Sequence, residues 1–266
     1  MIKKPSMNFY HWLRSLLPRE LNIPQDLAKQ TLAKLGYFRF RTRVASEGAS
    51  VPDVDLYRPL FSPWDGLKGF REIYEQVRPY TLVSPDRCWI LASCMAHARN
   101  LEGDFAELGV FRGGTALLAA MLLAEAKDQR ALHLFDSFAG MPTTSAGEPY
   151  KAGDFNQTSA QSVGNLVTGT GANAKLHVGF IPDTFANLDI QRLAFAHIDV
   201  DLYQSVLDSV AFVYPRLVPG GIIIFDDYGN PSCVRAREAT EKAFSNLREK
   251  PIYLPTGQAL IIKLGL

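Results

Sequence analysis

The sequence LAFAHIDVD at residues 193–201 decides the fold, together with a second stretch of the same kind, GGIIIFDDY at residues 220–228. Each stretch is a short apolar run that ends in carboxylates, which is typical of a buried strand whose last residues reach the edge of a sheet. Residues 203–217 lie between them and have the length and pattern of a single crossover helix. A strand, a helix and a strand in this order predict two parallel strands, usually adjacent, with their carboxyl ends at the same edge.

Four acids end these strands and should gather at the edge where open α/β sheets bind ligands: Asp199, Asp201, Asp226 and Asp227. Carboxylates packed together repel one another and raise each other's pKa. A hard divalent cation such as Mg²⁺, which prefers oxygen ligands, removes that repulsion. For any one acid a strand cap or a solvated loop is the commoner explanation, but Asp199, Asp226 and Asp227 together favour a metal site.

The rest of the chain continues the alternation of strands and helices. Strands are expected at residues 105–110, 131–138, 175–179, 193–199 and 221–226, and further helices at residues 84–99, 115–127 and 235–247. This order predicts a parallel sheet that is covered by helices on both faces. Two closing apolar runs on either side of residues 255–257 predict an antiparallel last strand. The expected fold class is therefore α/β, with a Rossmann-like, mostly parallel sheet.

Residues 1–80 differ from this pattern, and we expect an N-terminal helical arm and lid there, followed by one domain at residues 81–266. A helical pattern at residues 25–35 precedes a stretch at residues 45–63 that is rich in Ser, Pro, Gly and Asp, as long loops and lids are. The apolar side chains within residues 9–17 favour docking onto the protein's own core or onto a second subunit. A homodimer is therefore an expectation.

Composition excludes several classes of protein. The chain has 266 residues, a formal net charge of +1 and 47% hydrophobic residues, so no global field draws it to nucleic acid or to anionic lipid. It contains no apolar run of roughly eighteen residues that would span a membrane. Its three cysteines follow no metal spacing and fit reduced thiols. We expect a cytoplasmic protein with no nucleic-acid partner and no transmembrane segment.

A glycine-containing turn, ELGVFRGG at residues 107–114, follows the first strand. Glycines at such a turn let a ligand approach the backbone closely. A dinucleotide site would need the spacing G-x-G-x-x-G, and Phe111 stands where its second glycine would be. An acid followed by Gly109 and Gly113 suits instead an adenosine ligand without a pyrophosphate, and Glu107 could balance an ammonium or sulfonium group of that ligand.

The second strand ends in Asp136, which is followed by Ser137. An acid at this place commonly binds a ribose, because two carboxylate oxygens accept hydrogen bonds from both hydroxyl groups at once. A cap of the following turn is the alternative. The glycine turn and the acids of the later strands together favour the ribose contact.

Several segments together resemble the macrocin O-methyltransferase family, bacterial enzymes that methylate sugar hydroxyls of natural products. The segments are DFAELGVFRGG at residues 104–114, DSFAGMP at 136–142, IDVDLY at 198–203, YPRLVPGG at 214–221 and DDYG at 226–229. The resemblance covers roughly residues 70–265. It implies a class I methyltransferase fold that uses S-adenosylmethionine and Mg²⁺ to methylate a small-molecule or sugar acceptor.

The resemblance also implies roles for particular residues. Cofactor contacts are expected from Glu107, Gly109, Asp136 and Ser137, and from Thr81 before the first core helix; metal contacts are expected from Asp199, Asp226 and Asp227. Asp201 is the candidate general base, because it lies two residues past Asp199 and would project to the same side of an extended strand. His197 and His133 are rival bases.

Two alternative functions stay open from the sequence. One is a nicotinamide-dependent oxidoreductase, against which the missing G-x-G-x-x-G and the clustered acids both argue. The other is a catalytically silent relative that binds the cofactor within a biosynthetic assembly. Retention of all four acids favours an active enzyme.

Overall fold

The computed structural model describes residues 62–66, 68–145, 147–148 and 150–265. Most of the predicted arm and lid, and the apolar side chains of residues 9–17 on which the expected homodimer rests, lie outside these residues. The described residues between positions 62 and 80 form α3 (Pro63–Gly66), α4 (Lys68–Val77) and the 3-10 helix η1 (Arg78–Tyr80). The ring of Phe70 on α4 packs edge-on against Trp89, so these helices belong to the same packed unit as the helix that follows.

The described residues form one sheet of seven strands in the order β3-β2-β1-β4-β5-β7-β6. Its parallel strands are β1 (Asp104–Leu108), β2 (Leu132–Asp136), β3 (Ala174–Val178), β4 (Leu193–Ile198) and β5 (Leu217–Phe225). The closing strands β6 (Ile252–Tyr253) and β7 (Ala259–Ile262) are antiparallel. The predicted fold class and the antiparallel last strand are confirmed, as is the adjacency of β4 and β5.

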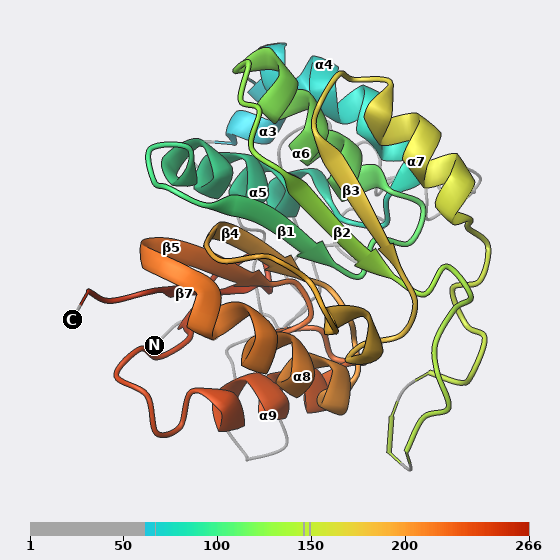
Figure 1. Ribbon diagram of the computed structural model, residues 1–266, viewed down its shortest axis with the longest axis vertical. Helices are drawn as coiled ribbons and strands as arrows, with labels where there is room; N and C mark the ends of the chain where they lie inside the picture. Colours follow the sequence, from blue (N-terminus) through green and yellow to red (C-terminus); the bar gives the residue numbers. More distant parts are fainter. Residues whose placement is uncertain (1–61, 67, 146, 149, 266) are drawn as a thin grey trace, which may run out of the picture. The chain divides into compact units, whose positions relative to one another are not determined.

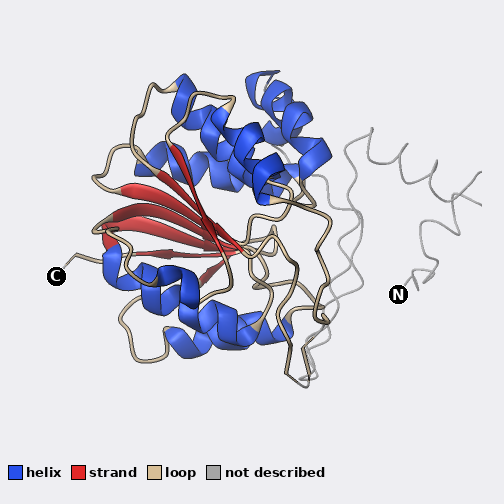
Figure 2. Cartoon of the chain, turned by 45° about the vertical axis from the view of Figure 1, so that its right-hand side comes forward, coloured by secondary structure: helices blue, strands red, loops and turns tan. Residues whose placement is uncertain are grey.

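Helices cover both faces of this sheet, which Figure 2 shows between two blue layers. One layer contains α4, α5 (Pro85–Ala98), α6 (Gly114–Glu125) and α7 (Ala160–Thr168), and the other contains α8 (Tyr203–Val213) and α9 (Val234–Ala243) (Figure 1). Each layer has its own apolar core, with Phe105 and Leu118 in the first and Phe135 and Phe212 in the second. This burial on both faces explains why β4 is buried along its whole length.

Three predicted boundaries need correction. The crossover helix ends at Val213, and β5 begins at Leu217 rather than at Gly221, because Leu217 pairs with Leu193 ahead of a register shift in β4. The last helix ends at Ala243. Helix α7 was not predicted at all, although Ser159 caps it by accepting a hydrogen bond from the backbone N–H of Ser162.

None of the described helices is both long enough and apolar enough to cross a membrane.

Candidate functional site

A cavity of about 240 Å³ opens at the carboxyl edge of the sheet, where β1, β2, β4 and β5 end. It brings together most of the residues that the sequence singled out: Thr81, Gly109, Asp136, Ser137, Asp199, Asp201, Asp226 and Asp227. Glu107 and Gly113 do not line this cavity in the described part of the chain. Topology accounts for the convergence, since the carboxyl ends of parallel strands share one edge.

The turn after β1 is held against β4 by close backbone packing. Gly109 has φ +86°, and a Cβ atom there would lie 1.8 Å from the backbone oxygen of Asp199. Gly113 has φ +82° and directly precedes α6. A Cβ atom added to Gly113 would lie 3.0 Å from the side chain of Val163. The next residue was missed by the sequence interpretation: a Cβ on Gly114 would lie 2.5 Å from the Cβ of Thr81, so this glycine seats the Thr81 segment.

Asp136 holds the same turn from the end of β2. Its Oδ2 accepts hydrogen bonds from the backbone N–H groups of Val110 at 2.7 Å and Phe111 at 2.8 Å. Its Oδ1 accepts from the N–H of Phe138 at 2.7 Å, which is the turn cap considered as the alternative. Each carboxylate oxygen has two acceptor sites, so Oδ2 is fully used and Oδ1 can accept one further bond toward the cavity that Asp136 lines. Ser137 caps the turn that follows β2, because its Oγ donates a hydrogen bond to the carbonyl of Gly140.

Glu107 lies behind the cavity, buried in β1. Its Oε1 is 2.9 Å from Nδ1 of His197 on β4. Its Oε2 is buried and has no hydrogen-bond partner among the described residues. A buried carboxylate oxygen without a partner is costly, and a cationic group nearby would satisfy it. The residue therefore fits the ammonium or sulfonium of the expected cofactor by chemistry.

The acids of β4 and β5 form two adjoining groups of possible metal ligands. One group contains His197, Asp199 and Asp226, and the other contains Asp201, Asp227 and Cys233, with the ligand atoms of each group within 4.8 Å of one another. Carboxylate oxygens dominate both groups, which fits a hard cation such as Mg²⁺. Of the expected ligands, Asp199 and Asp226 share the first group, and Asp227 belongs to the second, although all three line the same cavity. Asp227 accepts a hydrogen bond from the backbone N–H of Asp201 at 2.9 Å.

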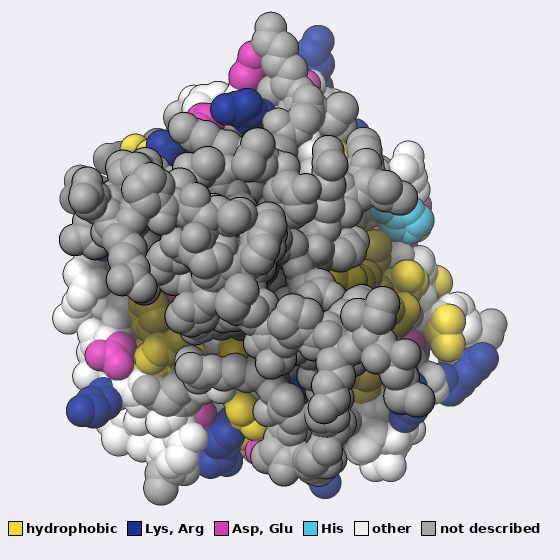
Figure 3. All heavy atoms as spheres, turned by 180° about the vertical axis from the view of Figure 1, so that it is seen from behind, with side chains coloured by type: hydrophobic (Ala, Val, Ile, Leu, Met, Phe, Trp, Pro, Cys, Tyr) yellow, Lys and Arg dark blue, Asp and Glu magenta, His cyan; other side chains and the backbone are white. Residues whose placement is uncertain are grey.

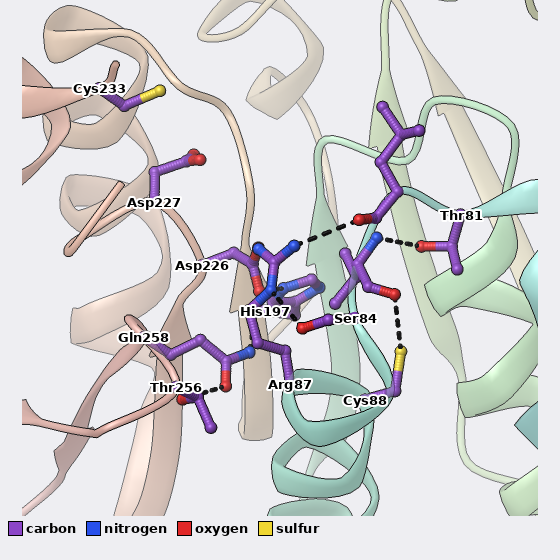
Figure 4. A network of polar contacts seen from close by, with 12 residues as sticks. Thr81, Ser84, Arg87, Cys88, His197, Asp226, Asp227, Cys233, Thr256 and Gln258 are labelled. Carbon is purple, nitrogen blue, oxygen red and sulfur yellow. Dashed lines mark hydrogen bonds and ion pairs between the residues drawn. The ribbon is translucent and has the colours of Figure 1, made fainter. Parts of the chain in front are cut away.

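Asp226 is the most thoroughly engaged of these acids (Figure 4). Its Oδ1 accepts a hydrogen bond from Nε2 of Gln258 at 2.8 Å and lies 3.5 Å from Nε2 of His197. Its Oδ2 accepts from Nη1 of Arg87 on α5. The sequence interpretation missed Arg87 and Gln258, because no local pattern connects either residue with β5.

Charges within the cluster are partly balanced. Burial by itself would lower the pKa of His197, but hydrogen bonds to Asp226 and Glu107 outweigh it and raise that pKa to about 10. His197 is therefore a buried cation at neutral pH. Burial and the neighbouring carboxylates raise the pKa values of Asp199 and Asp227 well above the ordinary range. The pKa of Asp226 is lowered despite burial, through its hydrogen bond with His197 and the charge of Arg87.

Asp201 does not project from an extended strand, as the sequence interpretation assumed. β4 ends at Ile198, and Asp201 has φ +59°, so the chain turns before it reaches this residue. Its Oδ1 lies 3.3 Å from Sγ of Cys233, whose thiol can donate to it. Burial, which outweighs the hydrogen bonds to Asp201, raises its pKa to about 6. The group is ionised at neutral pH and can still accept a proton.

The rival bases lie elsewhere. His197 is 2% exposed and is bonded to Glu107. His133 is 3.0 Å from His177 and 3.3 Å from Asp104, in a separate network on β1, β2 and β3. Neither histidine lines the cavity among the described residues.

Apolar side chains surround the mouth of the cavity. Tyr80, Leu82 and Phe180 line it and are 40%, 68% and 42% exposed. The face shown in Figure 3 has hydrophobic side chains in several patches, and charged side chains of both signs lie around its margin. A largely apolar rim around a few polar groups is typical of sites for small organic ligands.

The sheet order, the glycine turn after β1 and the antiparallel β7 define a class I methyltransferase fold. The solved structure of the O-methyltransferase NovP matches 70% of this chain and 83% of its own at a TM-score of 0.63 and 22% identity. CalS11, a calicheamicin methyltransferase, matches 76% of this chain and 93% of its own at a TM-score of 0.58 and 18% identity. These likenesses show the fold.

Sequence comparison gives the family. The model of the macrocin O-methyltransferase (TylF) family matches residues 77–251, and the chain belongs to this family. It is 33% identical over 170 residues to the 8-demethyl-8-(2,3-dimethoxy-α-L-rhamnosyl)-tetracenomycin-C 4′-O-methyltransferase of Streptomyces olivaceus, a match that spans 58% of this chain and 64% of that protein. It is 28% identical over 173 residues to the mycinamicin III 3″-O-methyltransferase of Micromonospora griseorubida, across 59% of this chain and 68% of that protein.

Proposed function

We propose that this protein is an S-adenosylmethionine- and Mg²⁺-dependent O-methyltransferase that acts on a hydroxyl group, in particular a sugar hydroxyl of a natural product or glycan. One observation carries the proposal: the acids at the ends of β4 and β5 line the same cavity as the glycine turn and Asp136. A methyl donor, an acceptor hydroxyl and a group that takes up its proton must all meet at one place, and this cavity offers one. The names of the relatives support the reaction class.

The cofactor would be held by the segments that line the cavity on the β1 and β2 side. Gly109 keeps the turn close to β4, Asp136 and Ser137 face the cavity at the end of β2, and Thr81 closes it from the segment before α5. Glu107 would supply a negative charge behind the turn. When bound, S-adenosylmethionine supplies a methyl group that its sulfonium already makes electrophilic. The protein must therefore supply alignment, which contributes up to roughly 7–11 kcal/mol in well-oriented model reactions.

Asp199, Asp226 and Asp227 would hold the divalent cation, which supplies Lewis-acid polarisation of oxygen groups. Asp201 would take the proton of the acceptor hydroxyl. Its carboxylate lines the cavity, and its pKa of about 6 leaves it ionised at neutral pH. A positioned base of this kind adds about 10²–10⁴-fold to a rate.

Family membership and the absence of a G-x-G-x-x-G turn argue against the nicotinamide-dependent alternative. The predicted homodimer and the cytoplasmic location remain predictions, and light scattering of the purified chain would measure its oligomeric state.

The reaction is tested with labelled S-adenosylmethionine and a panel of glycosylated natural products, each with added Mg²⁺ and with a chelator. We expect label transfer to a sugar hydroxyl with Mg²⁺ and its loss with the chelator. Methyl transfer that is equally fast with and without the chelator would contradict the metal requirement. Tight cofactor binding without transfer to any acceptor would favour a catalytically silent relative.

A further inference from the structure

Arg87 is a cation built into the wall of the candidate site. It lies in the first turn of α5, and its side chain is only 23% exposed. Among the described residues that line the cavity it is the single lysine or arginine. A partly buried charge that is paired with a buried carboxylate needs an explanation beyond solubility.

Each of the three nitrogens of the Arg87 guanidinium group donates a hydrogen bond. Nη1 donates to Oδ2 of Asp226, Nε donates to Oγ of Ser84 at 3.2 Å, and Nη2 donates to the carbonyl of Leu82 at 3.3 Å (Figure 4). One planar group thus connects the end of β5 with the segment that precedes α5. The same segment lines the cavity through Leu82, and through Thr81, whose Oγ1 accepts from the N–H of Val83 at 3.0 Å.

Both carboxylate oxygens of Asp226 already face a donor or a positive charge. Oδ1 is shared by Gln258 and His197, and Oδ2 is held by Arg87. Gln258 is neutral. His197 is also cationic, but it is buried and its other nitrogen is hydrogen-bonded to Glu107, so it is fixed in place. Arg87 has both the like charge that a divalent cation repels and the length to move, since it reaches Asp226 from another element.

We propose that Arg87 and a divalent cation compete for Asp226, so that metal binding also releases the hydrogen bonds that Arg87 makes with residues 82–84. This inference rests on the proposed metal site and states how Arg87 regulates metal binding there. Metal loading would thereby be coupled to the segment that lines the cofactor side of the cavity. The coupling is reciprocal: if metal binding changes the affinity for a ligand that contacts residues 81–84, that ligand must change the affinity for the metal by the same factor.

The test is calorimetric titration of the full chain with Mn²⁺, for wild type, Arg87→Met and Arg87→Lys. Met replaces the apolar stem of Arg without the guanidinium charge, and we expect about tenfold tighter Mn²⁺ binding, because a partly buried ion pair no longer has to be broken. Lys keeps the charge without the planar fork and should bind Mn²⁺ about as weakly as wild type. Arg78→Met is the matched control, since Arg78 is exposed and pairs with Glu75.

Hydrogen exchange supplies a readout that does not depend on turnover. Mn²⁺ should accelerate amide exchange in peptides that cover residues 81–88 of wild type, whereas Arg87→Met should exchange fast there with or without the metal. Thermal melting shows whether each variant is folded.

The outcomes separate the inference from the function it rests on. If wild type binds Mn²⁺, Asp227→Asn abolishes binding, and Arg87→Met binds no more tightly than wild type, the competition is wrong and the metal site stands. Unchanged exchange at residues 81–88 on metal binding would overturn the coupling. If neither wild type nor Arg87→Met binds Mn²⁺, both the metal site and the competition are refuted.

Discussion

Neighbouring acids at the ends of β4 and β5 differ in their tendency to ionise. Asp226 is stabilised as a carboxylate by His197 and Arg87, whereas burial and like charges raise the pKa values of Asp199 and Asp227. A buried carboxylate with a raised pKa lowers the stability of the fold when it is ionised. The cluster therefore opposes folding stability in the absence of a bound cation, as groups arranged for function often do.

The substitution Asp227→Asn tests directly whether the charged cluster lowers the stability of the fold. The amide has the shape of the carboxylate, and its oxygen can still accept from the N–H of Asp201, but the repulsion is removed. We expect the melting temperature without divalent cations to rise by about 2–4 °C for each kcal/mol gained. Metal-dependent methyl transfer should fall by at least about 10²-fold.

Asp189→Asn, at an exposed acid remote from the cavity lining, is the control and should change neither quantity. Full activity of the Asp227→Asn variant would show that Asp227 is not a metal ligand.

The junction between β1 and β4 depends on one glycine. Both Gly109 and Gly153 have φ +86°, but an added Cβ would collide with the backbone of Asp199 only at Gly109, and nothing lies within 4 Å at Gly153. The pair therefore separates the cost of an unusual backbone angle from the cost of a collision.

Gly109→Ala should destabilise the protein by about 3–5 kcal/mol, because strain and overpacking add. Gly153→Ala should cost about 1 kcal/mol, from the backbone angle alone. Urea denaturation of both variants measures the difference. Equal losses of unfolding free energy would show that the close approach of β1 to β4 is not needed.

Histidines connect the first three strands away from the cavity. His133 on β2 lies between Asp104 and His177, and His177 stacks on Phe135 at 4.4 Å between ring centroids. Burial, followed by the charges of His133 and Lys175, lowers the pKa of His177 to about 4. Burial also lowers the pKa of His133.

Stability should consequently fall as the pH drops from about 6.5 toward 4. In this window the unfolded histidine binds a proton and the folded one does not, so unfolding takes up protons. His177→Gln should flatten the pH dependence of the unfolding free energy there, and His97→Gln, at an exposed position on α5, should not. A steeper acid dependence in His177→Gln would show that the histidine is stabilised, rather than penalised, by its surroundings.

Local sequence patterns predicted most elements but missed those that depend on context. Residues 193–198 are apolar except for His197, and this short apolar run correctly predicted a buried strand. Helix α7 was not predicted, because Gly164 and several polar residues interrupt its apolar pattern, and only Val163 and Val167 of this helix are buried. The start of β5 was not predicted, because Pro219, Gly220 and Gly221 are residues typical of turns. In the structure Gly220 and Gly221 instead form backbone hydrogen bonds with Lys263.

Across the whole molecule, the acids of the site were predictable and their partners were not. Topology alone places the ends of β1, β2, β4 and β5 at one edge, so the residues that follow these strands had to converge. Arg87 and Asp226 are separated by 139 positions in sequence, and no periodicity or motif connects them. The turn at Asp201 was also unforeseen, because a residue that is not glycine gives little sign of a left-handed conformation.

The central claim is that the cavity at the carboxyl edge binds S-adenosylmethionine. Calorimetric titration of the purified protein with S-adenosylhomocysteine, with NAD as the control, tests it most directly. We predict saturable binding of S-adenosylhomocysteine in the micromolar range and no binding of NAD. Absence of S-adenosylhomocysteine binding in protein that melts cooperatively would contradict the cofactor assignment, and with it the roles proposed for Glu107 and Asp136.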